Sequence, residues 1–187
     1  MIERSVKAQM TGEYDSLNQQ ILMNEKVLQD AVEKLQQRMA TDMHGALQQQ
    51  QQIHQLRESI YTEMVQRDAA MAMLIAYCWV GKHDELQDRI TQLDTLDVPH
   101  VQRVGHVKCA ELASHIAEKA RELSLLQARL DAMFTENNLE SVEALRKQIS
   151  DAEATLAALE DERMEQFMRL FQFSHRIRAT CKSMLEA

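Results

Sequence analysis

The chain has 187 residues, with one Pro, four Gly and 4% aromatic residues, against 27% charged residues. Gly and Pro average about 12% of residues in proteins, and strands favour aromatic and β-branched residues. This composition excludes turn-rich β folds and predicts an almost wholly helical chain. The net charge of −8 argues against nucleic acid as the main ligand, since binding phosphates requires a basic surface.

The first predicted element is a long N-terminal helical segment over residues 1–80, with a possible break at Gly45. Apolar residues recur at heptad spacing in two rows: Tyr14, Ile21, Leu28 and Leu35, then, shifted by four, Val32, Met39, Ala46, Ile53, Ile60 and Leu74, with Arg67 interrupting. We interpret the shift as a stutter in a coiled coil, which changes partner geometry. A helix of this length must pack on the rest of the chain or on another chain.

Three features of this segment need separate interpretation. Asn24 lies at a seam position, where a polar residue can fix register. The run of five glutamines at 48–52 is typical of a solvated helical surface. Residues 69–80 carry no charge but are too short for a bilayer span, which needs about 20 residues.

The apolar run at 69–80 has two interpretations. It is a candidate partner-binding surface, with Met71, Leu74, Ile75 and Trp79 as its anchors. Alternatively, the short helix predicted over residues 84–96 covers it through Leu86, Ile90 and Leu93. That helix follows a break at Gly81, and Asp84 is its candidate N-cap.

Residues 100–187 are predicted to form an antiparallel coiled-coil hairpin of two helices, about 100–134 and 142–185, joined by the polar turn 135–141. Their heptad rows are mostly apolar, and the exceptions are Lys119, Arg163, Gln166 and Thr180. Basic residues gather near the end of the second helix: Arg169, Arg176, Arg178 and Lys182. They either complement the helix dipole or contact an acidic helix of a partner.

The sequence contains no recognisable catalytic, cofactor or metal motif. It has no His-Glu-x-x-His pattern and no glycine-rich phosphate loop. Its three cysteines are odd in number and form no Cys-x-x-Cys pair, which favours a reducing compartment. Cys181 lies near Arg178 and Lys182, which could lower its pKa somewhat, but no base accompanies it. We expect neither an enzyme nor a small-molecule substrate.

The expected architecture is therefore all-α: an elongated antiparallel coiled coil or helical bundle, with a long N-terminal helix, a short linking helix and a C-terminal hairpin, in one elongated unit. The expected function is that of a non-catalytic scaffold subunit in an intracellular assembly of the cytoskeletal, motor-adaptor, kinetochore or tethering kind. Its partners would be other coiled-coil chains, identical or different. No transmembrane segment is expected, and the absence of an N-terminal apolar region predicts a cytoplasmic or nuclear location, not secretion.

The alternative is a self-contained three-helix binding module of the spectrin-like or vesicle-fusion-regulator-like kind. Its helices would be residues 46–80, 100–134 and 142–185, and residues 2–44 would project from it as an arm.

Overall fold

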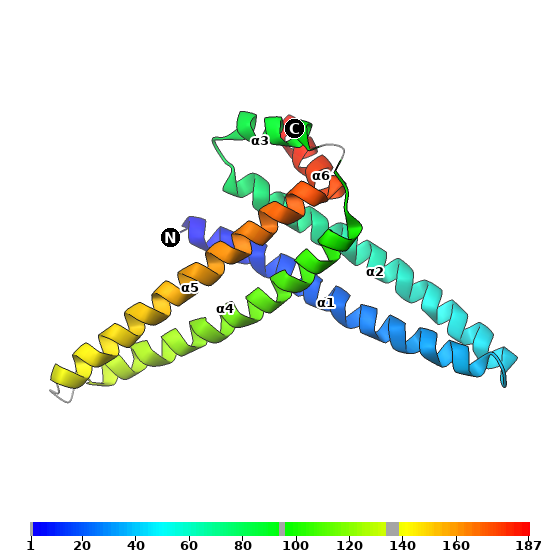
Figure 1. The fold of residues 1–187 in the computed structure, drawn as a ribbon, viewed down its shortest axis with the longest axis horizontal. Coiled ribbons are helices and arrows are strands. Elements are labelled where there is room, and N and C mark those ends of the chain that lie inside the picture. Colours follow the sequence, from blue (N-terminus) through cyan, green and yellow to red (C-terminus); the bar gives the residue numbers. More distant parts are fainter. Residues whose placement is uncertain (1, 94–95, 134–138) are drawn as a thin grey trace. The chain divides into compact units, whose positions relative to one another are not determined.

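The computed structural model describes residues 2–93, 96–133 and 139–187, and these residues form six α-helices and no strand. The helices are α1 (Ile2–Arg38), α2 (Met43–Cys78), α3 (His83–Gln92), α4 (Pro99–Met133), α5 (Leu139–Phe173) and α6 (His175–Glu186) (Figure 1). The prediction of a helical chain is confirmed over this part of the sequence. The polar turn predicted at 135–141 lies mostly outside it.

The chain divides into two compact units, where the sequence predicted one elongated unit. Unit 1 comprises Met1–Arg103 and Leu170–Ala187, and unit 2 comprises Val104–Arg169. The predicted hairpin over residues 100–187 therefore contributes to both units. Its C-terminal part, including α6, belongs to unit 1 together with α1, α2 and α3.

The predicted N-terminal segment over residues 1–80 consists of two helices. α1 ends at Arg38, α2 begins at Met43, and the two helices lie side by side in opposite directions (Figure 1). Asp42 is the N-cap of α2, where its Oδ1 accepts a hydrogen bond from the Gly45 backbone nitrogen at 2.9 Å. The break therefore precedes Gly45, which lies inside the first turn of α2.

The chain reverses between α1 and α2, so the interpretation of the two rows as one coil with a stutter was wrong. Each helix keeps a buried row of its own, with Tyr14 and Ile21 on α1 and Ile53, Ile60 and Leu74 on α2. Because α1 packs against α2, residues 2–44 are also not a projecting arm.

The break predicted at Gly81 is confirmed, and Gly81 has the left-handed φ of 84° that favours glycine. The helix that follows begins one residue earlier than expected. Lys82 occupies the N-cap position of α3 without a side-chain cap bond, and Asp84 lies within the first turn. A carboxylate there still interacts favourably with the positive end of the helix dipole.

The predicted helix over residues 142–185 is interrupted at Ser174, which the apolar rows do not reveal. Ser174 is buried and accepts a hydrogen bond from the Ile177 backbone nitrogen at 3.4 Å, as the N-cap of α6. α6 then contacts α2 and α3. One continuous helix to Leu185 was therefore a wrong expectation.

Partners from elsewhere in unit 1 bind the last carbonyl groups of α5. Arg178 donates to the oxygens of Phe171 and Gln172, at 3.3 and 2.6 Å. The Phe173 oxygen accepts from the Val98 backbone nitrogen at 3.2 Å and from Gln102 Nε2 at 2.6 Å. These bonds replace the intrahelical partners that a helix end lacks, which is why the break is stable without Gly or Pro.

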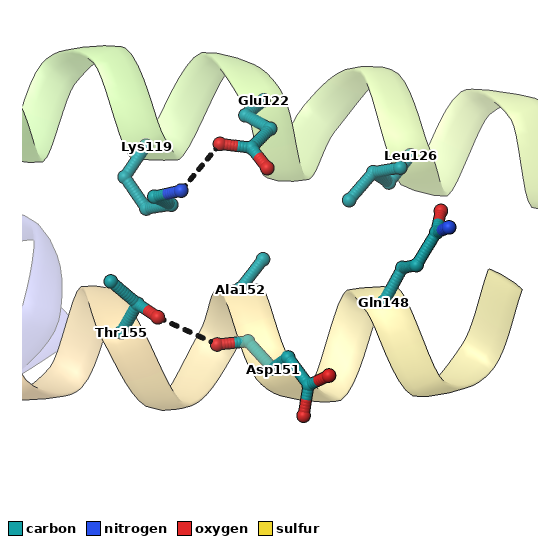
Figure 2. A pocket seen from close by; sticks show the side chains of 7 residues that line it. All are labelled: Lys119, Glu122, Leu126, Gln148, Asp151, Ala152 and Thr155. Atoms are coloured by element: carbon teal, nitrogen blue, oxygen red, sulfur yellow. Dashed lines mark hydrogen bonds and ion pairs between the residues drawn. The ribbon is translucent and has the colours of Figure 1, made fainter.

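In unit 2, α4 and α5 lie side by side (Figure 1), and Lys119, Leu126 and Ala152 of the predicted rows lie between them (Figure 2). From residue 143 to residue 159 of α5, the residues that are not exposed are Leu145, Ile149, Ala152, Leu156 and Leu159. From residue 114 to residue 133 of α4, they are Ile116, Lys119, Leu123, Leu126, Leu130 and Met133, together with Ala120. An ion pair between Lys108 Nζ and Glu162 Oε1, at 3.3 Å, joins the two helices.

Candidate functional site

The apolar anchors predicted to bind a partner lie mostly in the core of unit 1. Met71 and Leu74 are 0% exposed, and Ile75 is 1% exposed. α6 packs on this part of α2, where the Cys181 thiol lies 3.3 Å from the Ala72 oxygen as a donor. The prediction that these three residues form a partner-binding surface was therefore wrong. They are core residues, because another helix of the same chain covers them.

The covering helix is α6, not α3 as the alternative interpretation had it. α3 contacts α6, and its own apolar residues Leu86 and Ile90 are buried. α3 therefore packs on α6, which in turn covers α2.

Trp79 is the remaining anchor, and it is half-buried at the C-terminal end of α2. Lys82 Nζ lies 6.0 Å from the centre of its ring, and the Arg89 guanidinium carbon lies 5.1 Å from it. Cations at this range are attracted to an indole face. The ring thus fastens the α2–α3 turn to α3.

The four basic residues predicted to contact a partner do not form one patch. Arg178 is 0% exposed, and besides the carbonyls of α5 its Nη2 donates to the Leu96 oxygen at 2.5 Å. Arg178 therefore stabilises the fold, and its prediction as a partner-binding residue was wrong. Arg176 is half-buried and also bonded within the chain, whereas Arg169 and Lys182 are exposed.

A buried polar network between α1, α2 and α6 is the feature that the sequence did not reveal. Arg67 donates to Asn18 Oδ1 at 3.4 Å and to Asp68 Oδ1 at 3.2 and 3.3 Å. Arg176 of α6 reaches Asp68 Oδ2 at 3.3 Å, and its guanidinium lies 5.3 Å from the ring of Tyr61. Arg67 and Asp68 are 5% and 4% exposed, so the network ties three helices together inside unit 1.

Burial raises the pKa of Asp68 above its ordinary value, although the charges and hydrogen bonds of Arg67 and Arg176 act in the opposite direction. Desolvation therefore outweighs the two guanidinium groups. Asp68 fixes the position of α6 on α2 at an energetic cost that an exposed carboxylate would not incur.

A second polar layer lies between α1 and α2. Glu63 is 8% exposed, and its carboxylate accepts hydrogen bonds from Gln20 Nε2 at 2.9 Å and from Asn24 Nδ2 at 2.9 Å. Asn24 thus pairs across the two helices at a seam position, as a register-fixing residue does. A slip of α1 along α2 would leave the Glu63 carboxylate without these donors.

An exposed row runs along α2 on a face that α1 does not cover. We call it the outer stripe; it consists of Met43, Leu47, Gln50, His54, Arg57, Tyr61 and Val65. Met43 is 70% exposed, Leu47 55%, Tyr61 60% and Val65 39%. Spacings of three and four residues place all seven on one side of a helix. The stripe runs into the face of α2 on which α6 packs, at Asp68 and Ala72.

A hollow of about 240 Å³ lies between α4 and α5, lined by Lys119, Glu122, Leu126, Gln148, Asp151, Ala152 and Thr155 (Figure 2). It occurs where the small Ala152 and the polar Lys119 replace large apolar residues of the rows. Lys119 Nζ donates to Glu122 Oε2 at 2.5 Å, and Thr155 donates to the Asp151 backbone oxygen at 2.8 Å. These polar groups therefore bond within their own helices and do not converge on a common point.

Cys181 and Cys78 have environments that suppress the thiolate form. Burial raises the pKa of Cys181 to about 12 and also raises that of Cys78, where the charge of Lys7 opposes the shift. The expectation that Arg178 and Lys182 lower the pKa of Cys181 was wrong, because the thiol is buried. A thiol becomes a nucleophile through its thiolate.

Among the residues that the structure describes, no group of three or more His, Cys, Asp or Glu side chains could hold a metal ion. No described helix combines the length and the hydropathy that crossing a bilayer requires. Comparison with protein-family models, curated proteins and solved structures found no match to the chain.

Proposed function

We propose that this chain is a non-catalytic scaffold subunit that pairs, helix against helix, with partner chains of a larger intracellular assembly. The cytoskeletal, motor-adaptor, kinetochore and tethering classes contain subunits of this architecture. The observation that carries the proposal is the outer stripe of α2. Its apolar side chains are exposed to solvent at spacings of three and four residues, which are the spacings by which helices pair in coiled coils.

The energetics favour an added helix at this stripe. Burying one exposed Leu, Met or Tyr side chain contributes about 1.5–3 kcal/mol, and three such side chains lie along the stripe. The polar layers at Asp68 and Glu63 support the proposal in another way. They hold α1, α2 and α6 in one register, so the stripe is presented on a support of fixed geometry.

The antiparallel coiled-coil arrangement of α4 and α5 is the second part of the proposal. Over residues 114–133 and 143–159, the covered residues follow the heptad rows with Ala120 as the exception, as in a two-stranded coiled coil. Half-buried positions such as Leu126 leave room for a further helix to cover the seam. We therefore assign unit 2 a pairing role as well.

Affinity capture from native cells with quantitative mass spectrometry tests the proposal. The bait is the full chain, compared with the variant Leu47→Glu/Tyr61→Glu, which places two carboxylates on the outer stripe. The control is Leu125→Glu, which alters a 67% exposed leucine of α4. We expect the double variant to lose coiled-coil partners that the wild type and the control retain. Equal partner sets for all three baits, with equal circular dichroism, would contradict the proposal.

A further inference from the structure

The outer stripe passes through the part of the chain that has the least charge. Residues 43–56 form the longest stretch without Asp, Glu, Lys or Arg in a chain whose net charge is −8. The stretch spans about 20 Å of helix. It includes the glutamine run 48–52, of which Gln50 belongs to the stripe and is exposed.

This surface is complementary to itself. An interface with two-fold symmetry brings the same patch of both copies together, so a charged patch repels itself. The 43–56 stretch contains no Asp, Glu, Lys or Arg and so avoids that repulsion. Each glutamine amide also carries both donors and an acceptor, so a glutamine can pair with the same residue of a second copy.

Charges at the two ends of the stretch select the direction of pairing. Asp42 precedes it and Arg57 follows it, and both side chains are exposed. In an antiparallel pair centred on Gln50, Arg57 of each copy meets the Asp42 end of the other, and Leu47 meets His54. A parallel pair would instead place Asp42 against Asp42 and Arg57 against Arg57.

The neighbouring acid is compatible with the antiparallel arrangement. Glu58 is exposed and lies 3.4 Å from His54 within its own helix. In an antiparallel pair it approaches the start of the other α2, where the N-cap is Asp42 and the first turn contains no acidic residue. The positive end of a helix dipole favours a carboxylate at that position.

We propose that a second copy of this chain occupies the outer stripe, in an antiparallel α2–α2 contact whose two-fold axis passes close to Gln50. The inference rests on the proposed function, because it names the partner of the same stripe. Met43 and Leu47, which are 70% and 55% exposed in the single chain, become covered in the pair.

Cross-linking locates the axis. In the full chain carrying Cys78→Ser, which removes the exposed thiol, we compare Gln50→Cys with Gln48→Cys. Both positions are exposed, but two residues along a helix turn the side chain to another face. We expect mild oxidation to give a disulfide-linked dimer at least about tenfold faster for Gln50→Cys. Equal rates, or a faster reaction of Gln48→Cys, would overturn the proposal.

Sedimentation equilibrium measures the association itself. We expect the mass of the wild-type chain to rise from 21.6 kDa to twice that value between about 1 and 100 µM. Leu47→Glu and Arg57→Glu should each weaken association about tenfold or more, while Leu125→Glu should not. A wild type that stays monomeric, or Leu47→Glu associating like the wild type, would exclude a second copy. The scaffold role would still stand if the capture experiment showed a different chain lost from the stripe variant.

Discussion

Arg176 of α6 reaches the buried carboxylate of Asp68 on α2, with Nη1 3.3 Å from Oδ2. The contact joins positions 108 residues apart in the sequence. It occurs where the chain leaves α5 and returns to unit 1, so it helps to determine which face of α2 is covered and which face stays exposed as the outer stripe.

Removing the Asp68 carboxylate should destabilise unit 1. In Asp68→Ala the guanidinium of Arg67, which is 5% exposed, loses the carboxylate that pairs with it and retains its hydrogen bond to Asn18. A buried charge left without its counter-ion costs about 3 kcal/mol. Urea unfolding followed by circular dichroism measures this. Arg176→Ala is the matched variant, with an expected loss of about 1 kcal/mol because Arg176 is partly exposed.

Because Asp68 titrates and Asn does not, the difference in unfolding free energy between the wild type and Asp68→Asn should depend on pH. The pKa of Asp68 is raised in the folded chain above 3.8, so the folded state holds the proton more tightly than the unfolded state. The stability that this group contributes is fully present below pH 3.8 and is lost as pH rises through the folded pKa. Unfolding free energies measured from pH 3.5 to 7 should therefore shift in favour of the Asn variant as pH increases. A difference that is constant over this range, or shifts the other way, contradicts the assignment.

Arg178 should control the docking of α6. Its replacement by Ala removes the donor of three backbone carbonyls, of which that of Phe171 is at a buried position and those of Gln172 and Leu96 are at partly buried ones. Unsatisfied buried acceptors cost about 1–3 kcal/mol each, so α6 should open more often. Native-state labelling of Cys181, whose thiol is 0% exposed, then becomes faster. Cys78, which is exposed, serves as the internal control and should react at an unchanged rate.

Two glycines on helices should respond oppositely to alanine. At Gly45 a Cβ would overlap the Asp42 carboxylate, so Gly45→Ala displaces the N-cap of α2 and should lower stability by about 1 kcal/mol. At Gly12 of α1 no atom lies within 4 Å of the added Cβ. Gly12→Ala should therefore raise stability by up to about 1 kcal/mol, through helix propensity alone. Thermal unfolding of both variants measures the contrast, and equal signs would contradict it.

Heptad rows predicted Leu145, Ile149 and Leu126 among the covered residues of unit 2, but they did not predict the buried His106 and Phe167. They were not sufficient at Ser174. The apolar pattern continues through this residue, and the break depends on Arg178, Val98 and Gln102, whose positions are set by the tertiary fold.

The apolar pattern was likewise not sufficient to predict the candidate site. Met71, Leu74 and Ile75 form an apolar row that fits an interface or a core equally well, and only the return of α6 distinguishes the two. Arg67 interrupted a predicted row, which was the available signal of a polar layer. Its partner Asp68 lies at the adjacent position, which heptad periodicity assigns to another face.

The hydrogen bond from the Val98 nitrogen to the Phe173 oxygen closes the chain at the two points that flank unit 2. In topological terms, Val104–Arg169 is an insertion into unit 1, and this bond already joins the two segments of unit 1 next to the insertion. An insertion of this kind can change in length or sequence during evolution, while unit 1, which carries the outer stripe, keeps its own contacts.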